Sequence, residues 1–246
     1  NSKALLSYKV LMMKTLFFFF FFGGSKGIPH KNIKIFNGKP LICYAIDLAR
    51  QFVSDEDICV STDGDDIIHV VEDYGLEVPF KRPDELATDK SGSYGVMLHA
   101  LEFFEKKGKQ YDTLVLLQPT SPFRRVEDVR NCIDKYDLGN YDMVVSVMEA
   151  LTNPYYNCFI SSQDGCLQKL IDIKNIVRRQ DAPKAYEYNG ACYVMNASTL
   201  KKMPLSDFPR IGFVEMDELH SLDLDTMLDW KFAELIEKEK MGYDGK

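Results

Sequence analysis

Two aspartates near the C-terminal end have the spacing that first suggests chemistry. They are Asp223 and Asp225, in the stretch "SLDLDTMLD". In an extended backbone, residues two apart point to the same side, so the two carboxylates face the same way. Two such groups repel each other unless a cation lies between them, and a hard divalent metal is a natural ligand for their oxygens. The alternative is that Asp225 or Thr226 caps the following helix and Asp223 points to solvent.

A glycine- and lysine-rich stretch, "GGSKGIPHKN" (Gly23–Asn32), follows the first apolar run. Glycines let a backbone approach phosphates closely, and backbone amides and lysines supply positive potential. The stretch lacks the GxxxxGK[ST] pattern of a Walker A loop. With Lys26 and Lys31 in it, a phosphate-binding loop is one interpretation and an ordinary turn is the other.

Two further polar stretches follow apolar runs. "RPDELATDKSGS" contains Arg82 and several hydroxyls that could read the edge of a base, although a plain loop capped by Ser93 fits equally well. "LLQPTSPFR" has two prolines that stiffen a turn presenting Gln118, Thr120, Ser121 and Arg124. A rigid polar loop at the end of a strand favours a binding role.

Apolar runs rich in β-forming residues alternate with amphipathic segments along the chain. The predicted strands are Thr15–Phe22, Asp57–Thr62, Leu76–Phe80, Thr113–Gln118, Met143–Met148, Ala191–Asn196 and Ile211–Glu215. The predicted helices are Pro40–Phe52, Asp65–Tyr74, Ser93–Lys107, Val126–Tyr136 and Thr226–Lys240, the last with a stripe of Leu228, Phe232, Leu235 and Ile236. This alternation predicts an α/β fold with a mostly parallel sheet and helices on both faces. Ligands bind such sheets at the carboxyl ends of the strands, where the polar stretches begin.

Six consecutive phenylalanines, Phe17–Phe22, form the most unusual segment. A membrane-spanning helix needs about 20 apolar residues, and this apolar stretch covers only Thr15–Phe22. A signal peptide or lipid anchor remains an alternative, because lysines precede the run, but no small-residue cleavage pattern follows it. A buried strand with both faces covered is the favoured interpretation.

Composition narrows the possible functions. The 246-residue chain has a net charge of -7, which argues against a nucleic-acid polymer as partner but leaves room for one phosphorylated ligand. Its 6 cysteines are scattered, so we expect reduced thiols, no zinc site and a cytoplasmic protein without membrane association.

Residues 1–13 are predicted to be a tail, and residues 14–149 and 189–246 are predicted to form one domain.

Residues 150–188 interrupt the alternation. They show no helical period, and turn-forming residues cluster in "TNPYYN" and "SSQDG". An excursion of this length inside a domain is usually functional or part of an interface. We expect an inserted hairpin region that pairs with a second subunit.

Together these segments resemble the acylneuraminate cytidylyltransferases, the CMP-sialic acid synthetases. The resemblance runs from about Lys14 to Lys240, and its motifs occur in the family's order: "GGSKGIPHKN", "VSTDGDDI", "RPDELATD", "LLQPTSPFR", "RRQDAP", "YNGACYV" and "LDLDT". It implies a Rossmann-like nucleotide-diphospho-sugar transferase fold and a homodimer. It also implies Mg²⁺-dependent transfer of CMP from CTP to N-acetylneuraminate or a related nonulosonic acid, with release of pyrophosphate.

The resemblance also implies roles for individual residues. Lys31 and the aspartates would be catalytic, with Mg²⁺ on Asp223 and Asp225. The triphosphate would lie on Gly23, Gly24, Ser25, Lys26, Lys31 and Asn32, and cytosine on Arg82, Ser91 and Ser93. The sugar would face Gln118 and Thr120, together with Arg179 and Gln180 from the same chain or from the neighbouring subunit.

The chain departs from the family pattern at two places. Phe19–Phe22 stand where the family has Ile-Pro-Ala-Arg, so Phe22 cannot supply the arginine's charge. Loss of a cation that contacts phosphate weakens transition-state stabilisation, which makes a weak or inactive nucleotide-binding homologue the alternative. Glu187 stands where many relatives have arginine, which leaves legionaminate, pseudaminate, Kdn or deoxyoctulosonate open as substrates.

Overall fold

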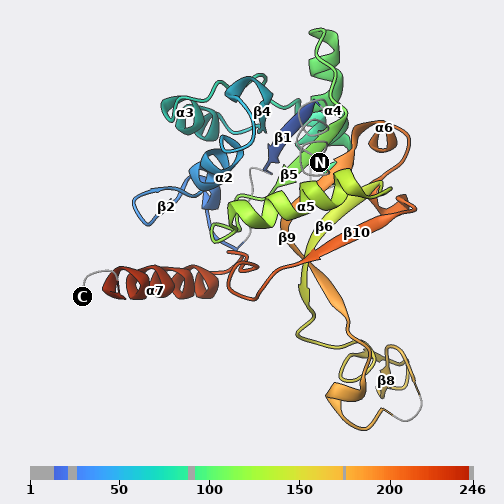
Figure 1. Cartoon of the computed structure of the whole chain (residues 1–246). Coiled ribbons are helices and arrows are strands. Elements are labelled where there is room, and N and C mark those ends of the chain that lie inside the picture. Colours follow the sequence, from blue (N-terminus) through green and yellow to red (C-terminus); the bar gives the residue numbers. More distant parts are fainter. Residues whose placement is uncertain (1–13, 22–26, 88–91, 174–175, 244–246) are drawn as a thin grey trace, which may run out of the picture.

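A six-stranded sheet forms the centre of the molecule (Figure 1). The computed structural model describes residues 14–21, 27–87, 92–173 and 176–243. The strand order is β10-β6-β9-β5-β1-β4. The bounds of these strands are β1 (Thr15–Phe20), β4 (Ile58–Ser61), β5 (Thr113–Leu117), β6 (Met143–Glu149), β9 (Tyr186–Asn196) and β10 (Ile211–Glu215).

The sheet is mostly parallel, as predicted. Strand β1 pairs in parallel with β4 and β5, and β10 pairs in parallel with β6. Strand β9 runs antiparallel between β5 and β6 and begins five residues before the predicted Ala191. The predicted strand 76–80 was wrong, because only an isolated bridge joins Thr62 to Lys81. Pro79 in that segment has no N–H to donate to a ladder.

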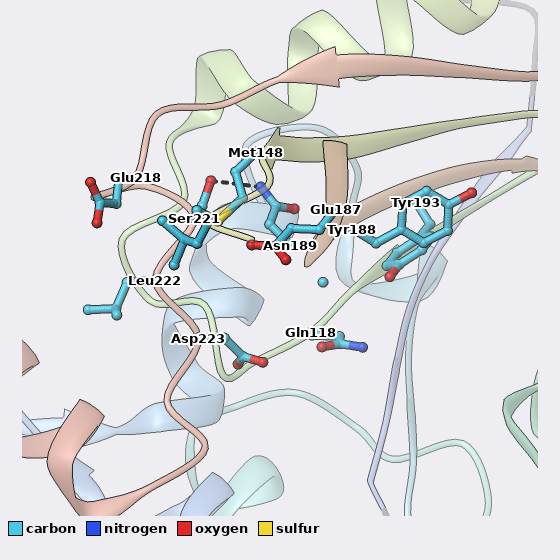
Figure 2. Close-up of a pocket in the computed structure, with 12 residues that line it drawn as sticks. Gln118, Met148, Glu187, Tyr188, Asn189, Tyr193, Glu218, Ser221, Leu222 and Asp223 are labelled. Atoms are coloured by element: carbon cyan, nitrogen blue, oxygen red, sulfur yellow. Dashed lines mark hydrogen bonds between the residues drawn. The ribbon is translucent and has the colours of Figure 1, made fainter. Parts of the chain in front are cut away.

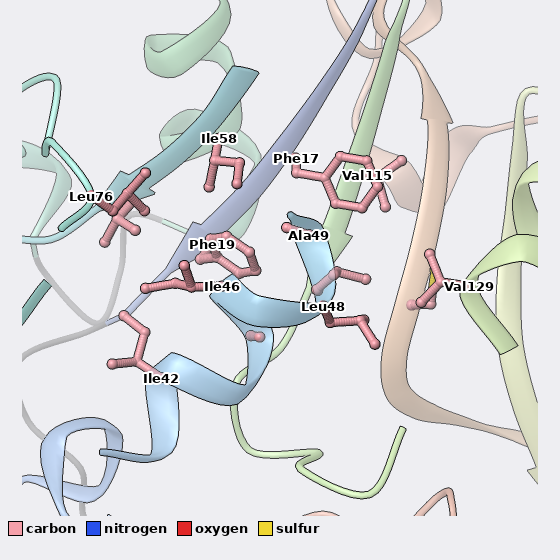
Figure 3. Packing of buried hydrophobic residues seen from close by; sticks show 14 of the residues in the cluster. Phe17, Phe19, Ile42, Ile46, Leu48, Ala49, Ile58, Leu76, Val115 and Val129 are labelled. Atoms are coloured by element: carbon pink, nitrogen blue, oxygen red, sulfur yellow. The ribbon is translucent and has the colours of Figure 1, made fainter. Parts of the chain in front are cut away.

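Phe17–Phe20 lie in the buried strand β1, which ends two residues before the predicted Phe22. Phe17 and Phe19 point into one apolar cluster (Figure 3). Leu16 and Phe18 belong to another cluster on the opposite face. All four side chains are at most 1% exposed. Among the described residues, no helix has the length and apolar character needed to cross a membrane.

Helices cover both faces of the sheet. The Phe17 face packs on α2 (Leu41–Ala49), α3 (Asp65–Asp73) and α5 (Val126–Leu138). The Phe18 face packs on α4 (Gly92–Lys106) and α6 (Ala197–Leu200). Short 3-10 turns lie at η2 (Asp55–Asp57), η3 (Asp84–Leu86) and η5 (Leu205–Asp207).

The last helix, α7 (Met227–Tyr243), packs through Trp230, Ala233 and the predicted Ile236, but the other three residues of the predicted stripe are exposed. Trp230 is 1% exposed and Ala233 is fully buried, whereas Leu228, Phe232 and Leu235 are 76%, 53% and 52% exposed. The Trp230 ring lies edge-on against Phe36 with centroids 5.5 Å apart, which fixes the rotation of the helix. Phe36 lies in a small hairpin of β2 (Ile35–Phe36) and β3 (Lys39–Pro40).

Residues 150–185 leave the sheet as an arm, which Figure 1 shows projecting away from the helices and strands of the body. Within it, β7 (Phe159–Ser161) and β8 (Leu167–Lys169) form a hairpin. Apolar side chains on the arm are exposed, with Leu167 at 71% and Val177 at 78%. The pairing of this arm with a second subunit stays a prediction.

Candidate active site

Loops from three distant parts of the chain meet at the carboxyl end of the sheet. The backbone N–H of Leu224 donates to the carbonyl of Thr120 at 2.9 Å. A Cβ on Gly27 would lie 2.2 Å from the carbonyl oxygen of Asp225, so only glycine allows this approach. Beneath them, Ile28 and Leu224 belong to one apolar cluster with the first turns of α7. Buried packing therefore holds the N-terminal and C-terminal loops together.

Lys31 and Asp225 form an ion pair, with Nζ 2.8 Å from Oδ1. Lys31 opens the 3-10 turn η1 (Lys31–Ile33). Its side chain is 12% exposed, while that of Asp225 is 70% exposed. Next to it, Asn32 is 7% exposed and its Oδ1 has no hydrogen-bond partner in the described structure. A cation and a carboxylate from opposite ends of the chain thus lie in one site.

Asp223 has the features of a metal ligand. Burial raises the pKa of its carboxyl above the usual value, opposed by a hydrogen bond from Thr120 and reinforced by the charge of Asp225. Its Oδ1 is buried and has no partner among the described residues, and an unpaired buried acceptor is costly. A divalent cation between the two aspartates would satisfy this oxygen. The described residues contain no group of three or more His, Cys, Asp or Glu, so further ligands would come from substrate or water.

The alternative was that Asp225 or Thr226 caps the following helix, and the structure confirms the cap at Thr226. Thr226 Oγ1 accepts from the backbone N–H of Asp229 at 3.3 Å and donates to the Asp229 carboxylate at 2.8 Å. This reciprocal pair closes the start of α7. Asp225 remains paired with Lys31 and is not a cap.

A cavity of about 470 Å³ lies beside Asp223 (Figure 2). Gln118 and Asp223 lie on one side of it, and Asn189 lies across from them. A Cβ on Gly190 would lie 2.6 Å from Gln118 Oε1, and its φ of +72 also favours glycine. The cavity is lined by Gln118, Met148, Leu151, Glu187, Tyr188, Asn189, Gly190, Tyr193, Glu218, Ser221, Leu222 and Asp223.

An irregularity in β9 forms the wall of this cavity. The register between β6 and β9 shifts between Val145 and Val147, where Asn189 and Gly190 leave the ladder. Asn189 Nδ2 donates to Ser221 Oγ at 2.9 Å, and Ser146 Oγ donates to Asn189 Oδ1 at 2.6 Å. This wall was not predicted, although a glycine inside a strand pattern is a signal for such a bulge.

Arg124 does not point into the site, contrary to the expectation that its loop presents it. The guanidinium is buried, and Nη1 donates to the carbonyl of Gln118 at 3.0 Å and to that of Ala191. Burial lowers its pKa to about 10. Because these carbonyls belong to two walls of the cavity, Arg124 ties the loop after β5 to the bulge of β9.

Arg82 is also buried. Its side chain is 0% exposed, pairs with Asp63 and donates to the backbone carbonyls of Phe21 and Ser61. Burial lowers its pKa, and the charge of Asp63 opposes this effect. These contacts favour a positioning role at the ends of β1 and β4 over the predicted role of reading cytosine.

The other predicted residues are divided between the body and the arm. Ser93 is half-buried in the first turn of α4. Arg179 and Gln180 lie exposed on the arm, in the 3-10 turn η4 (Arg179–Asp181), and do not line the cavity. Gly23, Gly24, Ser25, Lys26 and Ser91 lie outside the described residues, as does Phe22.

The site has the sequence signature of a known enzyme family. Residues 23–197 match the model of the cytidylyltransferase family, beginning directly after the phenylalanine run. The chain is 34% identical over 232 residues to post-translational flagellin modification protein B of Campylobacter coli, covering 93% of this chain and 97% of that protein. It is 33% identical over 223 residues to CMP-N,N'-diacetyllegionaminic acid synthase of Legionella pneumophila, covering 90% of this chain and 95% of that one.

The fold agrees with this assignment. The structure of CMP:2-keto-3-deoxy-manno-octonic acid synthetase in complex with CTP superimposes with a TM-score of 0.65 at 14% identity, covering 92% of this chain and 99% of that chain. At this identity the likeness concerns the fold alone. The family match and the relatives together show that this chain belongs to the cytidylyltransferase family.

Proposed function

We propose that this protein transfers CMP from CTP to a nonulosonic acid, a nine-carbon 2-keto sugar acid, and releases pyrophosphate. The main support is the position of the Lys31–Asp225 pair and the unpartnered Asp223 oxygen beside a cavity of about 470 Å³. The charged groups suit a triphosphate, and the cavity has room for a sugar. The name of the Legionella relative, a CMP-N,N'-diacetyllegionaminic acid synthase, supports this substrate class.

The nucleotide side of the site would act through charge. Mg²⁺ on Asp223 and Asp225 would neutralise the phosphates of CTP and make the sugar hydroxyl easier to deprotonate. The Lys31 ammonium is held near the same place by Asp225 before CTP arrives, so it needs little reorganisation to contact a phosphate. In the reaction, the anomeric oxygen of the sugar bonds to the α-phosphorus as the bond to pyrophosphate breaks.

The sugar side of the site would act by orientation. Gln118 offers an amide, and Thr120 lies beside Asp223. The bonds among Ser146, Asn189 and Ser221 keep the facing wall rigid. A fixed wall reduces the entropy lost when the hydroxyl is aligned with the phosphorus.

The sugar carboxylate also requires a cation or several donors. None of the described residues lining the cavity is Lys, Arg or His. Arg179 lies exposed on the arm, which also exposes Leu167 and Val177. A homodimer in which the arm brings Arg179 and Gln180 to the neighbouring copy's cavity would cover these apolar side chains and supply the missing charge.

The second candidate function is nucleotide binding without turnover. It is favoured by Phe22, which has no charge where the family pattern has arginine. Such a protein would bind CTP and release no pyrophosphate with any sugar acid.

One assay separates these functions. Pyrophosphate release from CTP and Mg²⁺ is measured with N-acetylneuraminate, N,N'-diacetyllegionaminate, pseudaminate, Kdn and deoxyoctulosonate in turn. We expect sugar-dependent release with at least one nine-carbon acid. Binding of CTP in calorimetry without release for any sugar would overturn the proposal and support the second candidate.

A further inference from the structure

The cavity has a charge that the transfer reaction does not explain. Besides Asp223, which has a place in metal binding, it is lined by two further carboxylates, Glu187 and Glu218. No cation is among its described lining residues. A cavity meant for a sugar acid is therefore negative on the sugar side, where the substrate's own carboxylate would be repelled.

The two glutamates come from different elements. Glu187 lies in β9 with Met148 of β6 as its Cα partner, and both residues line the cavity. Glu218 lies in the segment after β10, at another edge of the cavity (Figure 2). Both side chains are exposed.

Neighbouring carboxylates have cation partners, but these two do not. Glu149 pairs with Lys184 at 3.2 Å, and Asp217 pairs with Arg125 at 3.4 Å and with His220. In the part of the chain that the structure describes, Glu187 and Glu218 form no ion pair. Their acceptor oxygens are open to a ligand.

Aromatic rings give a second, independent indication of the ligand. Tyr188 and Tyr193 line the cavity with ring centroids 5.9 Å apart and an angle of 88° between their planes. Glu187 and Tyr188 are consecutive residues of β9, and both line the cavity. The faces of tyrosine rings attract a cation, and a carboxylate beside them forms a charge-assisted hydrogen bond with an ammonium.

We propose that this cavity recognises a protonated amino substituent on the sugar acid, placed away from the sugar's carboxylate. The inference rests on the proposed function and specifies the substrate class of the same site. Glu187 is the main acceptor, the tyrosine rings face the ammonium, and Glu218 adds negative potential. Because the carboxylates are exposed, each contributes a few-fold and the two together about tenfold in preference for an amino sugar over its N-acetylated or hydroxyl counterpart.

The test compares matched sugars. N-acetylneuraminate is compared with its 7-amino-7-deoxy and 9-amino-9-deoxy derivatives, both by kcat/KM for pyrophosphate release and by calorimetric Kd in the presence of CTP. We expect about a tenfold preference for one amino derivative at neutral pH. The preference should disappear at a pH above the pKa of the substrate's own amine.

Variants assign this preference to the glutamates. Glu187→Gln and Glu218→Gln should each reduce the amino-to-hydroxyl ratio, and the double variant should abolish it. The matched control is Glu72→Gln, which removes the same charge from the exposed surface of α3, outside the cavity.

The outcomes are distinguishable. Failure of every sugar to react would count against the proposed function, while the calorimetric ratio would still decide the inference. Equal Kd values for all three sugars, or a ratio unchanged in the double variant, would overturn the inference. A double variant that loses a dimer while the ratio is unchanged would also overturn it and assign the glutamates to the subunit interface.

Discussion

Two regions differ in how their apolar side chains are covered: the floor of the site, which is the buried cluster beneath Lys31 and Asp225, and the arm of residues 150–185. In the floor, Ile28 and Leu224 lie in one buried cluster, and a hydrogen bond from Leu224 N–H to Thr120 joins two distant loops. On the arm, Leu167 and Val177 are exposed at 71% and 78%. The floor is therefore held by packing within one chain, whereas the arm exposes apolar side chains that the proposed homodimer would cover.

The largest effect is expected at the floor. Asp225→Asn should lower kcat by about 10²–10³-fold, because it removes one of two carboxylates for the metal and the partner that orients Lys31. Pyrophosphate release measures the loss, and circular dichroism should show an unchanged fold. Asp73→Asn on the exposed end of α3 is the control. Undiminished activity of Asp225→Asn would refute the metal role.

The second effect tests whether the phosphate-binding part of the site lacks a positive charge at Phe22, where the family pattern has arginine. Phe22→Arg should restore a cation for the phosphates and raise kcat/KM by about 10²-fold. Phe22→Gln, which adds polarity without charge, serves as the control and should give no such gain. No gain from arginine would count against aligning Phe22 with the family arginine.

The third effect tests the arm. Arg179→Ala should raise KM for the sugar acid by about 30-fold and leave KM for CTP unchanged. Lys169→Ala, on the same arm, should have little effect. Kinetics with each substrate varied in turn separate the two constants.

Mixing variants shows which chain Arg179 serves. A heterodimer of Arg179→Ala with Asp225→Asn contains one intact site if Arg179 acts on the partner, and none if it acts within its own chain. At a sugar concentration well below KM, where each variant alone has little activity, an equal mixture of the two should then recover roughly a quarter of wild-type activity. No recovery from a mixture shown to form heterodimers would exclude a site shared between subunits.

The fourth effect tests the link between the two walls of the cavity. Arg124→Met removes donors from the carbonyls of Gln118 and Ala191, which should cost about 1–3 kcal/mol of unfolding free energy and raise KM for the sugar about tenfold. Arg124→Lys should recover part of the loss. Arg130→Met, at an exposed arginine of α5, is the matched control. Equal changes in KM for CTP and sugar would indicate a general loss of structure instead of a positioning role.

Sequence patterns predicted what depends on local periodicity. Successive side chains of a strand point to opposite faces, so Phe17 and Phe19 enter one core and Leu16 and Phe18 the other. The same geometry supported the prediction that this run is a buried strand. Three of the four residues of the predicted α7 stripe were wrong, because the edge-on contact of Trp230 with Phe36, far away in the chain, fixes the helix rotation.

The site shows the same division. Motifs brought attention to Lys31 and Asp225, which the structure joins at 2.8 Å. The wall at Asn189 and Gly190 was missed because it depends on a register shift in β9, an antiparallel strand that the chain inserts between β5 and β6. The burial of Arg124 was missed for a related reason, since its acceptor at Ala191 is 67 residues away.

The smallest expected effect is a shift in the melting temperature, Tm, caused by replacing Asp223. Burial raises the pKa of this carboxyl above its ordinary 3.8, so the folded state binds the proton more tightly than the unfolded state. Its contribution to stability is therefore greatest below that ordinary value and falls as the pH rises through the folded-state pKa.

At pH 7 without metal, Asp223→Asn should raise Tm by about 2 °C, and the gain should shrink as the pH is lowered. Mg²⁺ should raise the Tm of the wild type more than that of the variant, because the variant keeps only the Asp225 carboxylate of the two proposed metal ligands. Differential scanning fluorimetry between pH 5 and pH 8, with and without Mg²⁺, measures both shifts. A variant that melts below the wild type without metal would mean that the Asp223 charge stabilises the floor by itself, which removes the reason to place a cation there.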